Sequence, residues 1–121
     1  MSSEPASEYA AFPAQRAHFS SAQATKSDLF RGEHLFLGLN CFEPGQVQST
    51  HLHRGADKFY LIVSGKARMT VGADQWIAGP GQLIWAPADL PHGVVEALER
   101  TVMLVGMGPP PSARPSDRSD G

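Results

Sequence analysis

Two histidines, two positions apart, open residues 51–65 of the chain, which read HLHRGADKFYLIVSG. On a strand, successive side chains alternate between two faces, so His51 and His53 are expected to point to the same side. A pair of imidazoles on one face is typical of a metal site. The residues that should complete such a site include Asp57 and Lys58, however, and the ammonium of Lys58 would repel a cation.

The second half of this stretch, KFYLIVSG, predicts a strand that is covered on both sides. Phe59, Leu61 and Val63 fall on one face. Tyr60 and Ile62 fall on the other, so both faces are apolar. One cover would be the interior of a barrel. The other would be an N-terminal segment or a second subunit, and the sequence therefore predicts a homodimer whose contact uses the N-terminal half.

The middle of the chain is a series of short β-type segments separated by glycine, proline and aspartate. These segments are predicted at residues 33–42, 47–53, 59–63, 67–71, 75–77, 82–85, 93–97 and 101–106. Amphipathic segments of helix length are absent from this part of the sequence. Many short strands at regular spacing are typical of a small all-β sandwich or barrel, so we predict one barrel domain over residues 28–108.

The two ends of the chain differ in composition from its middle. Residues 1–27 are rich in Ser, Ala, Gln and Glu and have poor periodicity, which predicts a flexible N-terminal arm. Residues 109–121 read PPPSARPSDRSDG, a proline-, serine- and charge-rich run that predicts a disordered tail. Deletion of this tail is expected to leave the thermal stability of the protein unchanged.

Composition and charge limit the classes of function. The chain has 121 residues, of which 41% are hydrophobic and 18% charged, and this fits one domain with a real core. Its formal net charge of −2 and scattered basic residues argue against binding to nucleic acid or to a membrane surface. The single cysteine, Cys41, excludes an internal disulfide. Together with the lack of a signal peptide or a transmembrane run, it predicts a cytoplasmic protein.

Two motifs that occur in the expected order make the chain resemble the cupins, a superfamily of small double-stranded β-helix, or jelly-roll, barrels. The glycines and the His-x-His pair of the first cupin motif are matched by Gly45, His51, His53 and Gly65. The glycine, proline and histidine of the second motif are matched by Gly81, Pro87 and His92, with Asp89 and Glu96 in place of its second glycine and its asparagine. This resemblance spans residues 45–96 and implies an all-β jelly-roll barrel.

The resemblance also implies a divalent metal, Fe, Zn, Mn or Ni, held by His51, His53 and His92 together with an acidic residue. Lys58 stands where the family usually has this acidic ligand. Asp57 is one residue earlier and would reach inward only through a bulge. Three alternatives therefore remain: a three-histidine site, a site with Asp57 as fourth ligand, and a barrel without metal whose histidines form hydrogen bonds.

For the function, the resemblance implies a small polar organic molecule that binds at the metal. Three histidines leave open positions for a substrate and O₂, so a dioxygenase-type reaction is one expectation. Isomerisation or decarboxylation is the alternative, in which Lys58 carries a proton or binds a substrate carboxylate and Tyr60 lines the pocket. A non-catalytic binding or sensing module is the rival from another class, because this fold carries many functions.

Overall fold

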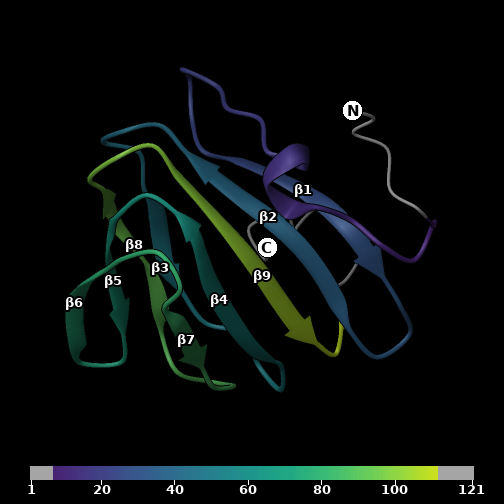
Figure 1. Cartoon of the computed structure of the whole chain (residues 1–121). Helices are drawn as coiled ribbons and strands as arrows, with labels where there is room; N and C mark the ends of the chain where they lie inside the picture. Colours follow the sequence, from purple (N-terminus) through teal and green to yellow (C-terminus); the bar gives the residue numbers. More distant parts are fainter. Residues whose placement is uncertain (1–6, 112–121) are drawn as a thin grey trace.

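The computed structural model describes residues 7–111, which form two facing antiparallel β-sheets (Figure 1). The first sheet has the strand order β1-β2-β9-β4-β7 and the second the order β3-β8-β5-β6. The strands are β1 (Thr25–Arg31), β2 (Phe36–Phe42), β3 (Gln48–His51), β4 (Asp57–Ser64), β5 (Ala67–Val71), β6 (Asp74–Ala78), β7 (Leu83–Ala86), β8 (His92–Ala97) and β9 (Thr101–Gly108).

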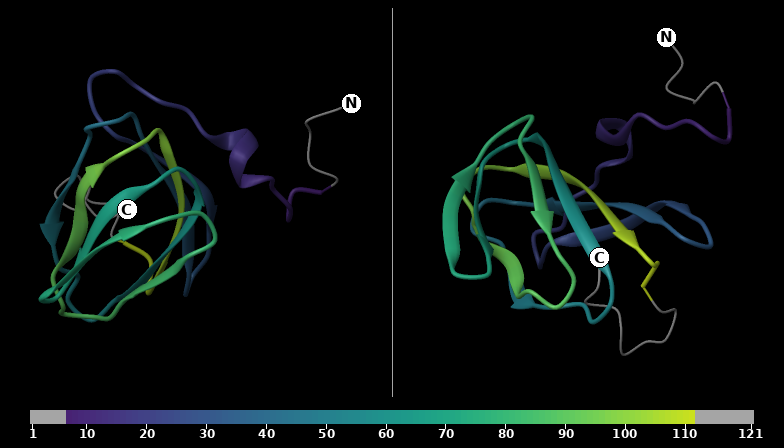
Figure 2. Two further views of the ribbon diagram at one scale, coloured as in Figure 1. Left: turned by 60° about the vertical axis from the view of Figure 1, so that its left-hand side comes forward. Right: turned by 90° about the horizontal axis from the view of Figure 1, so that it is seen from below.

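From β2 to β9 the chain crosses repeatedly between the two sheets, which curve around one shared interior (Figure 2). This is the jelly-roll arrangement, and the predicted all-β fold is confirmed. The predicted segments correspond to β2 through β9, with bounds that differ by up to three residues. The outer parts of the predicted arm and tail, residues 1–6 and 112–121, lie outside the described residues.

Apolar side chains from both sheets form one interior core between them. In β4, Tyr60 and Ile62 point inward and are almost fully buried, whereas Phe59 and Leu61 lie on the outer face and are partly exposed. The larger core residues are Phe36, Phe42, Tyr60, Ile62, Met69, Ile84, Val94, Met103 and Val105. Cys41, on β2, is also buried, and burial raises the pKa of its thiol, so it serves as a small packing residue.

One strand, β1, is absent from the sequence-based prediction, and it begins at Thr25, inside the range assigned to the arm. Its residues, TKSDLFR, lack a clean apolar pattern because β1 is an edge strand, hydrogen-bonded to β2. Before it, the segment with the 3₁₀ helix η1 (Pro13–Arg16) crosses the outside of the first sheet (Figure 1). The segment that leads into the barrel is therefore ordered against it.

The N-terminal segment covers only part of the outer face of the first sheet. Ala17 and Phe19 pack in the cluster that contains Val63 and the outer residues of β2 and β9. Toward β7 the face stays open, with Leu83 67% and Trp85 58% exposed. The N-terminal segment thus provides one of the two covers predicted for β4, and the homodimer predicted to form through the N-terminal half stays a prediction.

Gly65, the glycine that ends the first motif, lies in the turn from β4 to β5 with a φ of +89°. A side chain here would be strained in this left-handed conformation, and its Cβ would overlap the carbonyl of Arg100 and the backbone of Thr101. The motif glycine is thus needed by the fold.

Candidate metal centre

Three histidines meet at one end of the barrel interior. His51 ends β3 and pairs directly with His92, the first residue of β8. His53 lies two residues beyond the end of β3, so the loop, rather than strand alternation alone, turns it inward. The centroid of the His51 ring lies 4.8 Å from that of His53 and 4.7 Å from that of His92. The centroids of His53 and His92 are 5.1 Å apart. One ligand nitrogen from each ring lies within 4.8 Å of the other two, and the predicted convergence is confirmed.

Two of these rings are held by backbone carbonyls in the orientation that metal ligands need. Nδ1 of His51 lies 2.7 Å from the Ser49 carbonyl oxygen, and Nδ1 of His92 lies 3.1 Å from that of Leu90. A carbonyl oxygen only accepts hydrogen bonds, so each Nδ1 carries the proton and each Nε2 keeps its lone pair. Nε2 of His92 is buried and has no hydrogen-bond partner among residues 7–111. This atom is therefore set up to bind a cation.

Burial keeps His53 and His92 neutral. It lowers the pKa of His53 from its ordinary 6.5 to about 3, helped by the positive charges of Lys58, the neighbouring histidines and Lys26. It likewise lowers the pKa of His92 to about 4, although the hydrogen bond to the Leu90 carbonyl opposes this effect. Only the neutral imidazole binds a metal, so both side chains are available as ligands throughout the neutral pH range.

The same shifts predict a pH dependence for the stability of the metal-free protein. Between pH 6.5 and about 4, His53 and His92 are protonated in the unfolded chain but neutral in the folded one. The unfolded state then binds more protons, so the free energy of unfolding falls as the pH is lowered, by up to about 1.4 kcal/mol per pH unit for each proton. Chemical denaturation between pH 6.5 and 5 measures this slope. An equal slope in a variant that lacks both histidines would contradict the assignment.

Asp57, the candidate fourth ligand, does not join this group. Its side chain is exposed, and its carboxylate accepts a hydrogen bond of 2.9 Å from the backbone N–H of Ala88. Asp89 makes similar contacts, since its carboxylate accepts from the Gly55 N–H at 3.3 Å and its own N–H donates to the His53 carbonyl at 3.0 Å. The two aspartates join the loop that carries His53 to the loop before β8. Asp57 therefore stabilises the site from outside it.

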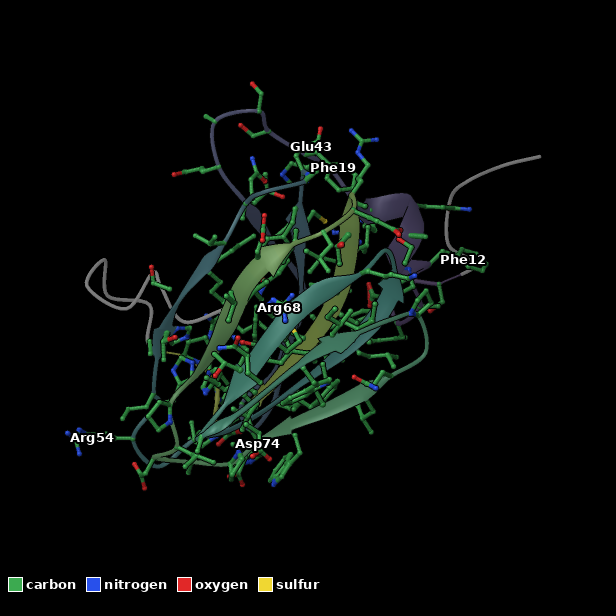
Figure 3. The ribbon with its side chains drawn as sticks, turned by 90° about the vertical axis from the view of Figure 1, so that its left-hand side faces the viewer. Phe12, Phe19, Glu43, Arg54, Arg68 and Asp74 are labelled. Atoms are coloured by element: carbon green, nitrogen blue, oxygen red, sulfur yellow. The ribbon has the colours of Figure 1, made fainter. Side chains whose placement is uncertain are left out.

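Lys58 and Tyr60 do lie beside the histidines, as predicted. Lys58 is 1% exposed, and its Nζ lies 4.6 Å from the centroid of the Tyr60 ring. The Tyr60 hydroxyl donates a 2.7 Å hydrogen bond to Oε1 of Gln48, and its ring centroid lies 6.1 Å from that of His92. Burial raises the pKa of Tyr60, so the phenol stays protonated. In contrast, Arg54 in the preceding loop points away from the barrel (Figure 3).

A cavity of about 640 Å³ opens next to His51. It lies between the N-terminal segment, with residues from 18 to 26, and inward side chains of β2 and β3 that include Asn40 and Gln48. The segment is held in place because Gln46 donates a 2.7 Å hydrogen bond to the Ser20 carbonyl. The cavity was not predicted from the sequence, since these N-terminal residues were assigned to a flexible arm and carry no motif.

Comparison with known proteins agrees with this geometry. A family model described as the cupin domain matches residues 38–106. The chain belongs to the cupin family. An uncharacterised protein of Streptomyces coelicolor, SCO3923, is 30% identical to this cupin over 82 residues, which cover 68% of the chain and 77% of the relative.

Two solved structures have the same fold as this cupin. TT1209 of Thermus thermophilus is 32% identical, with a TM-score of 0.75 over 79% of this chain and 92% of that one. An uncharacterised conserved protein of Klebsiella pneumoniae with a double-stranded β-helix domain is 17% identical, with a TM-score of 0.74 over 81% and 87% of the two chains. The described part of the chain contains no helix long and apolar enough to cross a membrane.

Proposed function

We propose that this cupin holds a divalent metal ion at His51, His53 and His92 and acts there on a small polar organic molecule by oxygenase-type chemistry. The observation that carries the proposal is the convergence of three imidazoles, with ligand nitrogens within 4.8 Å of one another, beside an open cavity. A metal bound by three protein ligands keeps open coordination positions for the substrate and for O₂.

The side chains around the histidines have separate tasks in this proposal. The cavity admits the substrate next to His51, and Gln48 lies in its lining. Gln48 also accepts the hydrogen bond of the Tyr60 hydroxyl, so Tyr60 keeps this amide in one orientation. Lys58, whose Nζ lies 4.6 Å from the centroid of the Tyr60 ring, supplies a positive charge beside the histidines. The apolar barrel core beyond these groups excludes bulk water.

The test is elemental analysis of protein purified without an affinity tag, together with O₂ consumption after loading with each of Fe, Zn, Mn and Ni. Iron in the purified protein, at about one ion per chain, is the expected result. A protein that takes up none of these metals would contradict the proposal and favour a non-catalytic binding or sensing module.

Lys58 supports a second candidate, isomerisation or decarboxylation. A buried lysine beside the metal ligands is placed to carry a proton to or from a bound molecule. The two candidates differ in their need for oxygen. Turnover of a candidate substrate that proceeds equally well without O₂ would favour the second reaction over the first.

We also propose that the chain forms a homodimer through the outer face of the first sheet near β7. On this face Phe59 pairs with Trp85 and Leu61 with Leu83, so four large apolar side chains lie together on two neighbouring strands. A second copy that covers them would remove this apolar area from water, which stabilises association.

Replacement of Trp85 by lysine is expected to convert this dimer to a monomer, since it would place a charge in the centre of an apolar contact. Analytical ultracentrifugation at micromolar concentration measures the effect. Glu96→Lys, at an exposed site on β8 in the other sheet, is the matched control and should leave the dimer intact. A monomeric parent protein would contradict the proposal.

A further inference from the structure

The wall of the cavity beside His51 is made largely by one segment. More than half of the lining residues lie between positions 18 and 26, and the others come from β2, β3 and the turn between them. β1 and β3 are edge strands of different sheets, so the cavity lies between two sheet edges. Residues 17–24, here called the N-terminal strap, form a loop at one end of the barrel before β1 begins (Figure 2).

One aromatic side chain anchors the strap to the barrel. Phe19 is the only large apolar residue in this stretch, which reads AHFSSAQA. Its ring packs against the outer cluster that contains Cys41, and the guanidinium of Arg100 lies 3.9 Å from the ring centroid. Arg100 is held in turn by the Glu43 carboxylate, to which it donates hydrogen bonds of 2.9 and 3.1 Å. Figure 3 shows Phe19 and Glu43 together at this end of the barrel.

A second attachment runs through Gln46. Its Nε2 donates a 2.7 Å hydrogen bond to the Ser20 carbonyl, and its Oε1 accepts one of 2.8 Å from the backbone N–H of Glu43. Glu43 thus orients both Gln46 and Arg100, and these three residues form the clasp of the strap. The side chain of Arg100 is 60% exposed, and ion pairs and cation–π contacts at exposed sites contribute little stability. The strap can therefore detach while the two sheets stay folded.

We propose that the N-terminal strap is a movable wall, which swings away from the barrel to admit a ligand to the cavity and is held closed by the clasp. The proposal rests on the proposed function only because it takes the cavity as the way to the three histidines. Detachment begins at Phe19 and ends at Thr25, where β1 starts to pair with Cys41 of β2. Arg100 is a positioning residue in this scheme, because it acts on the cavity through Phe19.

The experiment follows two side chains of the metal-free protein. Cys41 is the single cysteine of the chain and is buried under the strap, so its rate of reaction with Ellman's reagent measures detachment. His51 lines the cavity and its Nε2 is buried, so its acylation by diethyl pyrocarbonate, followed by peptide mass spectrometry, measures access to the cavity. His34, with an 88% exposed side chain, is the internal reference for the second reagent.

Two clasp variants test the residues. Arg100→Gln removes the guanidinium, and Gln46→Met removes the hydrogen bond to the strap. Each is expected to raise both rates about fivefold, the effect of losing contacts of this strength. Arg68→Gln makes the matched change on the outer face of β5 in the other sheet (Figure 3) and should react as the parent does. Unchanged rates in both clasp variants would overturn the proposal, as would faster reaction of Cys41 with unchanged acylation of His51.

Denaturation separates movement of the strap from loss of the fold. Thermal denaturation shows whether each clasp variant folds, and if one does not, the other decides. Local opening exposes little surface, so both rates should stay nearly constant in urea well below the unfolding transition. A steep rise of the rates in this range would overturn the proposal. Because both readouts use metal-free protein, a chain that takes up no metal would contradict the proposed function alone. A chain that binds metal but shows unchanged rates in both clasp variants would contradict the movable wall alone.

Discussion

Lys58→Glu is expected to tighten divalent metal binding on the order of 100-fold. Lys58 is inward-facing and 1% exposed, so glutamate at this position would place a carboxylate where an ammonium now lies beside the three imidazoles. The change removes a repulsion and adds an attraction, which together need to supply only about 2.7 kcal/mol to give a 100-fold change in affinity. It would also create the three-histidine, one-acid ligand set that the cupin resemblance implies.

Calorimetric titration of the metal-free parent and variant with zinc measures this effect. Lys66→Glu makes the same change of charge on the exposed turn before β5 and is the matched control, with little effect expected. Any turnover that depends on the Lys58 ammonium should fall in Lys58→Glu even though metal binds more tightly. Equal affinities in parent and variant would show that position 58 does not reach the metal. A weaker site in the variant would indicate that Asp57 is already the acidic ligand, contrary to its outward position in this structure.

His92→Ala is expected to weaken metal binding by more than about 100-fold. Removal of a residue that only orients a metal ligand through a hydrogen bond already costs about 10- to 100-fold in metal affinity. His92 supplies a ligand atom itself, so its loss should cost more. Its Nε2 is buried and directed into the cluster, whereas its Nδ1 is hydrogen-bonded to the Leu90 carbonyl oxygen. A variant without this imidazole keeps two ligands, which are too few for a stable site.

The control for this variant is His34→Ala, because the side chain of His34 is 88% exposed and lies outside the cluster. It should bind metal as the parent does. Thermal denaturation of both metal-free variants separates loss of the ligand from loss of the fold, since removal of the buried His92 ring also leaves a void. Parent-like zinc affinity in a folded His92→Ala protein would rule out the three-histidine site.

The barrel and its histidines were largely predictable because their signals are local or follow a known spacing. The apolar side chains of β4 alternate with period two, and glycines such as Gly65 mark where the strands turn. The same alternation places Lys58 on the inner face together with Tyr60 and Ile62. The convergence of His51, His53 and His92 followed from matching two motifs, each of which gives its histidines a place in the barrel.

What the sequence by itself determined is therefore the succession of β2 to β9 along the chain, the face on which each β4 side chain lies and the identity of the three histidines. Only the tertiary structure decided how polar segments pack. It turned Asp57 outward to the Ala88 N–H, and it laid the N-terminal segment against the barrel, where Arg100 stacks 3.9 Å from the Phe19 ring centroid. Such contacts join residues far apart in sequence, and the polar residues involved have no periodic pattern that favours one partner over another. The cavity beside His51 exists only because that packing places Lys26 and its neighbours next to β2 and β3.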